Sequence, residues 1–219
     1  MSVTFMLDTS RSMFFKSEDA AMSKFEYAAT IVATLAYMLM QQKDSFSLVL
    51  FDEQVRALLP FKSSGSHFRN VLQTMEKAEP GGTTDISNAL MRTAPHLKHR
   101  GLVVIVSDMI DEIGQMGMGL GQMSFLGQDV ILFHVEDPEE RDFPFAGQTI
   151  FLGLEEEGKL LCEPRDLRNA YLGERRRHLT DLRELCLRFG YEMEDMPTDA
   201  RLDAVLSGFV ALRAARRRR

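Results

Sequence analysis

Near its start, the chain places three oxygen-bearing side chains where they could bind a cation. Asp8, Ser10 and Ser12 directly follow the apolar run 3–7. One carboxylate and two hydroxyls at every second position, after a buried strand, make a small oxygen-rich cup. Hard divalent cations such as Mg2+ prefer oxygen ligands and usually keep several waters. The chemistry indicated is cation binding, although Asp and Ser also favour turns and caps, and short motifs match by chance.

Two later segments carry the same kind of oxygen-bearing side chain. Thr84 follows the glycine pair 81–82 at the entrance to a predicted helix, and Asp108 follows the apolar run 102–106. In open α/β sheets, ligands collect outside the carboxyl ends of the strands. We therefore expect the three oxygen-rich loops, which contain Asp8, Thr84 and Asp108, to lie together on one face of the sheet.

Composition limits the classes of protein to which this chain can belong. It has 219 residues, 45% of them hydrophobic, a net charge of -6 and a pI of about 5.4. This suits one large domain, or one with an appendage, and gives no overall case for nucleic-acid binding. The two cysteines, Cys162 and Cys186, have no close spacing and suggest reduced thiols. No apolar run approaches the roughly 20 residues of a membrane span, and no signal peptide is visible. We expect a cytoplasmic protein, with a membrane segment upstream of Met1 as an open alternative.

The hydrophobic pattern predicts an α/β fold. Continuous apolar runs are typical of parallel strands buried on both faces. Helical spacing of apolar residues alternates with these runs, so helices should cover both faces of a sheet of about six strands. Ser66 and Asp85 are expected to cap two of the helices. The expected parallel strands are 3–7, 46–51, 102–106 and 130–135, with an antiparallel edge strand at 55–60 and helices at 24–42, 67–76 and 86–97.

After Asp137 the composition and the hydrophobic pattern of the sequence change. We expect an acidic loop over 137–145, and a loose helix or mobile loop over the glycine-rich segment 114–127. We interpret 1–219 as one domain, in which 1–137 form the core with the metal site and 138–219 complete it. The elements expected in the second part are a hairpin of 149–154 and 159–162, a helix 166–189, a strand 191–193 and a helix 202–215.

Together, the three loops resemble those of the von Willebrand factor A-type (VWA) domain with its metal-ion-dependent adhesion site. That family carries Asp-x-Ser-x-Ser after the first strand, a Thr after a glycine-rich turn and an Asp after a later strand. The resemblance covers most of 3–135 and implies a Rossmann-like fold with a mostly parallel sheet. It also implies a site for Mg2+ or Mn2+ formed by Asp8, Ser10, Ser12, Thr84 and Asp108. Thr84, rather than Thr83, matches the spacing to the following helix.

A closer resemblance is to the bacterial domain-of-unknown-function family number 58. It rests on the segments 24–29, 80–85, 101–111 and above all 137–145, Asp-Pro-Glu-Glu-Arg-Asp-Phe-Pro-Phe. Members carry the A-type domain at the C-terminal end of a longer chain, whereas this chain begins at the first strand of that domain. Their genes often neighbour those of MoxR-type AAA ATPases. The resemblance implies a protein partner, with such an ATPase as the candidate, in the assembly or maturation of another complex.

We interpret the chain as a cation-dependent protein-binding module that is not an enzyme. An open position on the metal would accept an Asp or Glu carboxylate from the partner. One alternative is a Mg2+-dependent phosphohydrolase of haloacid-dehalogenase type using Asp8. That chemistry needs a second carboxylate two residues later, where this chain has Ser10. The other alternative is a metal-free scaffold. No phosphate loop or Gly-x-Ser-x-Gly elbow occurs, and His134 is expected to be a core histidine.

Overall fold

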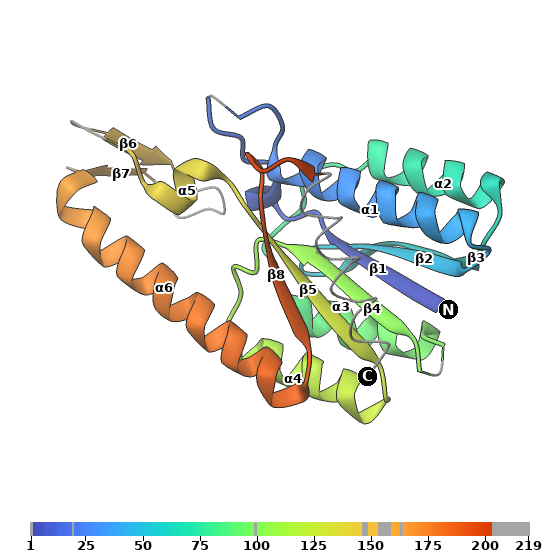
Figure 1. Cartoon of the computed structure of the whole chain (residues 1–219). Helices are drawn as coiled ribbons and strands as arrows, with labels where there is room; N and C mark the ends of the chain where they lie inside the picture. Colours follow the sequence, from blue (N-terminus) through green and yellow to red (C-terminus); the bar gives the residue numbers. More distant parts are fainter. Residues whose placement is uncertain are drawn as a thin grey trace.

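A six-stranded sheet forms the centre of the computed structural model, in the order β3-β2-β1-β4-β5-β8 (Figure 1). The structure describes residues 2–18, 20–98, 100–145, 149–152, 159–162 and 164–202. A separate two-stranded sheet pairs β6 with β7. The strands are β1 (Ser2–Asp8), β2 (Ser45–Phe51), β3 (Val55–Lys62), β4 (Leu102–Ser107), β5 (Asp129–Glu136), β6 (Thr149–Leu152), β7 (Lys159–Cys162) and β8 (Glu192–Pro197).

The central sheet is mostly parallel. β1 lies between β2 and β4 and is parallel to both, and β5 continues the parallel arrangement to β8. β3 is antiparallel to β2 and forms one edge. The α/β class and the antiparallel edge strand predicted from the sequence are confirmed.

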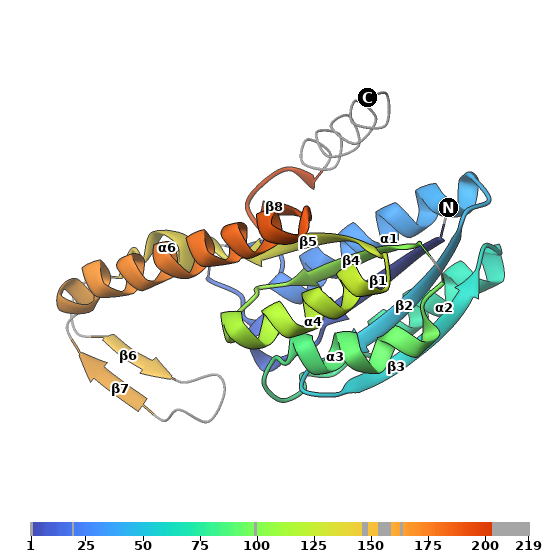
Figure 2. The ribbon, with the colours of Figure 1, turned by 90° about the horizontal axis from the view of Figure 1, so that it is seen from below.

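Helices cover both faces of this sheet. Figures 1 and 2 show α1 and α2 on one face, and α3 and α4 on the other. α6 begins beside the β6–β7 hairpin and runs back to α4. The helices are α1 (Lys24–Gln41), α2 (Gly65–Glu76), α3 (Ile86–Thr93), α4 (Ile113–Phe125), α5 (Pro138–Asp142) and α6 (Pro164–Phe189), with short 3-10 turns at Arg11–Phe14 and Ala94–His96.

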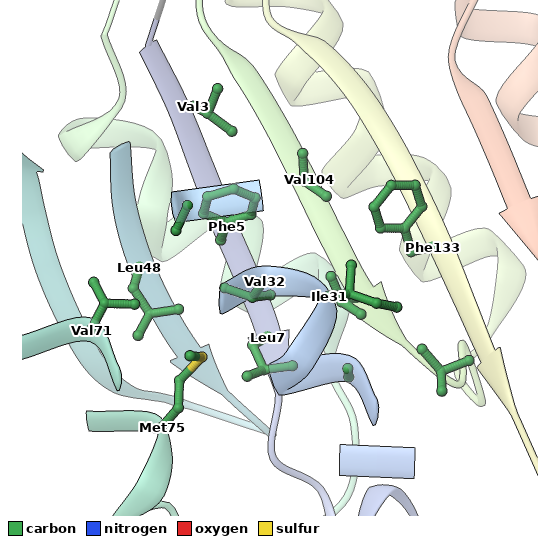
Figure 3. Packing of buried hydrophobic residues seen from close by; sticks show 14 of the residues in the cluster. Val3, Phe5, Leu7, Ile31, Val32, Leu48, Val71, Met75, Val104 and Phe133 are labelled. Carbon is green, nitrogen blue, oxygen red and sulfur yellow. The ribbon is translucent and has the colours of Figure 1, made fainter. Parts of the chain in front are cut away.

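Two hydrophobic clusters hold these layers together. Alternate residues of β1 face opposite layers, so Phe5 and Leu7 join the cluster under α1 and α2 while Met6 joins the other. Figure 3 shows the first cluster, in which Ile31 and Val32 of α1 pack over β1 and its neighbours. Burying large apolar side chains contributes roughly 1.5–3 kcal/mol each. A core on both faces therefore fixes the strand ends that carry the oxygen-bearing loops.

Two local expectations are wrong. Part of the expected acidic loop forms α5, because Pro138 suits the first turn of a helix and Asp137 with Glu140 makes a capping box. α2 begins earlier than expected, because Ser64 rather than Ser66 accepts the capping hydrogen bond, from His67 N. Of the two alternatives for the glycine-rich segment, the structure shows the helix, α4.

Close packing explains one of the glycines of α4. An added Cβ on Gly119 would lie 2.9 Å from the Ser87 Cα and 3.0 Å from the Leu90 Cδ1 of α3. Real Cβ atoms essentially never come that close to backbone, so this glycine lets the two helices approach. Gly119 therefore serves helix packing.

The second part of the chain contributes to the main sheet. β8 pairs with β5 along Ile131–Glu136 and is longer than the predicted strand 191–193. The predicted hairpin is present as β6 and β7, and the predicted helix 166–189 as α6. The predicted helix 202–215 lies almost entirely outside the described residues. None of the described helices is long and apolar enough to cross a membrane.

Candidate metal centre

The central strands of the sheet position the two carboxylates of the site. Asp8 is the last residue of β1, and Asp108 immediately follows β4. These strands are parallel neighbours, with Leu7 opposite Val106. Their carboxyl ends therefore bring Asp8, Ser107 and Asp108 together, and the exposed fraction of each is 5% or less.

Asp8 is surrounded by neutral hydrogen-bond donors. Its Oδ1 accepts from the Ser10 backbone N–H at 2.8 Å. Its Oδ2 accepts from the hydroxyls of Ser107 at 2.6 Å and Thr84 at 3.0 Å. No cation pairs with Asp8 among the described residues. Its carboxylate is thus fixed in orientation while its charge stays uncompensated.

The hydroxyls of Ser10 and Ser12, in the loop that follows β1, lie between the two carboxylates. Ser10 Oγ and Ser12 Oγ lie 3.1 Å apart, both buried, and the Ser12 hydroxyl helps to lower the pKa of Asp108. The structure thereby brings the five predicted residues together. Hydrogen bonds link Thr84 to Asp8, Asp8 to Ser10 and Ser10 to Ser12, and Ser12 lies close to Asp108. Thr83, by contrast, is exposed.

Asp108 differs from Asp8 in having an internal cation. The Lys24 ammonium, from the first turn of α1, donates to Asp108 Oδ2 at 2.8 Å and to Glu140 Oε1 at 2.7 Å. The Lys24 side chain is fully buried. Lys24 and Glu140 were missed by the sequence analysis, because 84 and 116 residues separate Lys24 from its two partners.

The electrostatics of the two carboxylates differ accordingly. Burial, reinforced by the nearby charge of Asp108, raises the pKa of Asp8 to about 7. Burial also acts to raise the pKa of Asp108, but the charge and hydrogen bond of Lys24 outweigh it and leave that pKa lowered. For Lys24, burial is opposed by the two carboxylates, and its pKa is raised. An opposite charge a few ångströms away favours the ionised form of each partner.

Backbone N–H groups hold the glycine turn, formed by Gly81 and Gly82, against the loop that follows β1 and against Asp52. Gly81 N–H donates to the Thr9 carbonyl at 2.7 Å, and Gly82 N–H to Asp52 Oδ2 at 2.9 Å. An added Cβ on Gly81 would lie 1.9 Å from Asp52 Oδ2, so glycine is required at this contact. Asp52 also pairs with Arg56. The role of Asp52 is not visible in the sequence, since a single acidic residue in a turn carries no distinctive signal.

The donor set fits a hard divalent cation. It offers carboxylate and hydroxyl oxygens and no sulfur or imidazole, which is the chemistry that Mg2+ and Mn2+ prefer. No group of three or more His, Cys, Asp or Glu in the described part of the chain could hold a metal. The proposed site instead relies on hydroxyls, because Ser10, Ser12 and Thr84 would supply three of its five ligands. The raised pKa of Asp8 is the second indication, because a buried carboxylate with no counter-charge is stabilised by a cation.

Other ionisable side chains outside the proposed ligand set have partners or burial that serve the fold. His134 is buried, and its Nδ1 lies 3.1 Å from Asp195 Oδ1 of β8. Glu112 caps α4, and Asp111 accepts from the Ile86 backbone N–H at 2.9 Å, which ties the Asp108 loop to α3. Cys186 is a buried free thiol.

Comparison with known proteins agrees with this architecture. The family described as "Protein of unknown function DUF58" matches residues 1–181. No curated protein sequence matches the chain. Several solved structures share the fold at low sequence identity, and they support the fold alone.

Three of these structures cover nearly the whole chain. An aerotolerance-related membrane protein from Bacteroides fragilis has a TM-score of 0.63 at 19% identity, covering 94% of this chain and 96% of that one. The conserved hypothetical protein BatB from Bacteroides thetaiotaomicron gives 0.58 at 17%, covering 89% and 90%. The VWA domain of SpRpn10 gives 0.56 at 12%, covering 95% and 93%. The fold is therefore of the von Willebrand factor A type.

Proposed function

The chain belongs to the DUF58 family, and we propose that it is a protein-interaction module whose binding depends on a divalent cation. Ser10, Ser12 and Thr84 would hold Mg2+ or Mn2+ through hydroxyls, and Asp8 and Asp108 directly or through water. The bound cation would supply a positive charge that attracts an anionic group of the partner. The observation that carries the proposal is Asp8, which is buried among neutral donors with its pKa raised to about 7.

The charge balance supports a carboxylate as the partner's contacting group. Only two carboxylates belong to the proposed ligand set, and one of them, Asp108, already shares its charge with Lys24. A cation with so little compensating charge keeps its attraction for a further anion. An Asp or Glu on the partner protein is the simplest such group. By family resemblance, we propose a MoxR-type AAA ATPase as partner, with a role in assembling or maturing another complex.

Calorimetry of the wild type and Asp8→Ala tests the metal site. A ligand that binds only the native state stabilises it by RT ln(1 + [L]/Kd), about 2.7 kcal/mol at 100 Kd. We expect Mg2+ or Mn2+ to raise the melting temperature of the wild type and to leave that of Asp8→Ala unchanged. Asp181→Ala is a matched control, because Asp181 is exposed on α6. An equal metal response in wild type and Asp8→Ala would refute the site.

The phosphohydrolase alternative makes an opposite prediction. Ser10 stands where that chemistry needs a general acid or base, and its hydroxyl lies 3.1 Å from another hydroxyl, that of Ser12. We expect no metal-dependent hydrolysis of a generic phosphoester such as p-nitrophenyl phosphate. Turnover that Asp8→Asn abolishes would favour the enzyme instead.

The scaffold alternative differs in its response to chelator. A metal-free scaffold would bind its partner equally well with and without EDTA. Pull-down against candidate MoxR-type ATPases, in Mg2+ and in EDTA, separates the two. We expect EDTA to abolish capture.

A further inference from the structure

Lys24 is an unusual residue for its position in the fold. Its side chain is fully buried, although removing an ammonium from water is unfavourable. It also lies in the first turn of α1, where the helix dipole disfavours a positive charge. Neither helix formation nor packing explains a lysine here. Its two carboxylate partners, Asp108 and Glu140, explain the lysine.

These partners belong to different parts of the molecule. Asp108 follows β4 and is a proposed metal ligand, whereas Glu140 lies on α5. Lys24 Nζ lies at nearly equal distances from the two, 2.8 and 2.7 Å. Its single positive charge is therefore divided between the metal site and α5.

α5 is in turn connected to its surroundings. Asp137, its N-cap, accepts from both the backbone N–H and the hydroxyl of Ser17, at 3.1 and 3.0 Å. The carbonyl of Glu140 accepts from the Tyr171 hydroxyl of α6 at 2.9 Å. A shift of α5 would therefore change how strongly Glu140 holds Lys24.

Building on the proposed function, we propose that Lys24 competes with the metal for Asp108, and that Glu140 weakens this competition by drawing Lys24 toward α5. Lys24 and Glu140 are thus positioning residues that set the cation affinity of the site. The segment Asp137-Pro138-Glu139-Glu140 gains a role in this way, as the part of the chain that tunes the metal centre.

Titration calorimetry with Mg2+ tests this on the full chain. Lys24→Met removes the competing charge and should tighten Mg2+ binding about tenfold, since one charge at close range contributes more than 1.4 kcal/mol in a buried setting. Glu140→Gln leaves Lys24 entirely to Asp108 and should weaken binding several-fold. The exposed residues Lys62 and Glu76 provide matched controls, and Lys62→Met and Glu76→Gln should bind as the wild type does.

A double-mutant cycle separates this mechanism from a general effect of charge. If Glu140 acts through Lys24, then Glu140→Gln should change Mg2+ affinity less than twofold in a Lys24→Met background. An equal effect of Glu140→Gln in both backgrounds would overturn the proposal. So would a weakening by both single substitutions, which is what a purely structural ion pair predicts.

The outcomes also separate this inference from the proposed function. A folded wild type that binds no Mg2+ would refute the proposed function, and this inference with it. If the wild type binds Mg2+ but the effect of Glu140→Gln does not depend on Lys24, the inference alone is refuted. Lys24→Met could fail to fold, because it leaves two carboxylates unpaired. Glu140→Gln keeps the test decisive, and so does the double variant, in which Glu140 no longer leaves an unpaired carboxylate. Circular dichroism checks that each variant folds.

Discussion

The carboxyl ends of β1 and β4 each deliver a buried aspartate to the same site, but the surroundings of the two aspartates differ. Asp8 is bound by hydroxyls and a backbone N–H, and its pKa is raised to about 7. Asp108 is bound by the Lys24 ammonium, and its pKa is lowered. One carboxylate has no internal counter-charge and the other already has one.

This difference makes the proposed metal site asymmetric, although its motif looks uniform. In the metal-free protein, Asp108 and Lys24 stabilise each other, whereas the charge of Asp8 opposes folding. A bound cation would gain most from Asp8. We therefore expect the two aspartates to respond in opposite ways when each is neutralised, and three predictions examine that contrast.

The largest expected effect is on the stability of the metal-free protein. Asp108→Asn leaves a buried Lys24 with Glu140 as its one remaining partner, and breaking a buried pair costs roughly 3–5 kcal/mol. Asp8→Asn instead removes an uncompensated buried charge and should stabilise the metal-free protein by about 1 kcal/mol at pH 7.5. Urea unfolding in EDTA measures both free energies of unfolding.

The sign of the difference is what matters in this experiment. Asp181→Asn, on the exposed face of α6, should leave the free energy of unfolding unchanged. Destabilisation of similar size by both Asp8→Asn and Asp108→Asn would mean that Asp8 is held as firmly as Asp108, and the contrast between the loops would be lost.

The second prediction concerns pH. The pKa of Asp8 is higher in the native state than its ordinary value of 3.8, so the native state keeps this proton to a higher pH than the unfolded chain does. The stability that comes from this proton is complete below about pH 4 and is lost as the pH rises to about 7. The loss approaches 1.4 kcal/mol per pH unit within that window.

Other groups contribute to the same profile, so a comparison isolates Asp8. The raised pKa of Glu140 acts in the same direction, whereas the lowered pKa values of Asp108 and His67 contribute stability that is lost on acidification. The difference in stability between wild type and Asp8→Asn should grow in favour of the variant from pH 5 to 7.5. The Mg2+-induced rise in melting temperature of the wild type should grow over the same range. A constant difference would show that Asp8 is ionised throughout.

The sequence predicted the framework of this site well, for a physical reason. Continuous apolar runs indicate strands buried on both faces, and strands of that kind end at a common edge. The places of Asp8 and Asp108 at that edge followed from the ends of β1 and β4 alone. β8 was harder to delimit, because a polar edge strand such as Glu192–Pro197 lacks an apolar run.

The charge distribution could not be predicted in the same way. Lys24 looks like an ordinary first-turn residue of an amphipathic helix, and nothing local reveals its contacts with Asp108 and Glu140. α5 is hard to predict for a related reason, because the acidic residues of its capping box, Asp137 and Glu140, also suit a loop. Long-range pairing of charges is a property of the fold, and a sequence pattern carries little trace of it.

The smallest expected effect distinguishes the neighbouring residues Thr84 and Thr83. Thr84 donates to Asp8 Oδ2 at 3.0 Å, whereas the Thr83 side chain is exposed. Thr84→Ala removes one hydrogen bond, donated by a neutral hydroxyl, which contributes about 1 kcal/mol, and it removes no charge. It should lower Mg2+ affinity several-fold, much less than Asp8→Ala does, and should weaken capture of the partner. Thr83→Ala should change neither.

Mg2+ calorimetry and the pull-down with and without EDTA make the Thr84 comparison. Because Thr84 lies on a loop and carries no charge, its loss should leave the fold intact, so a change in affinity reports on the oxygen itself. If Thr83→Ala were the more damaging change, the glycine turn would be displaced by one residue when the cation binds. If neither substitution mattered while EDTA still abolished capture, the cation would bind away from the Asp8 loop, and the asymmetry between Asp8 and Asp108 would need another explanation.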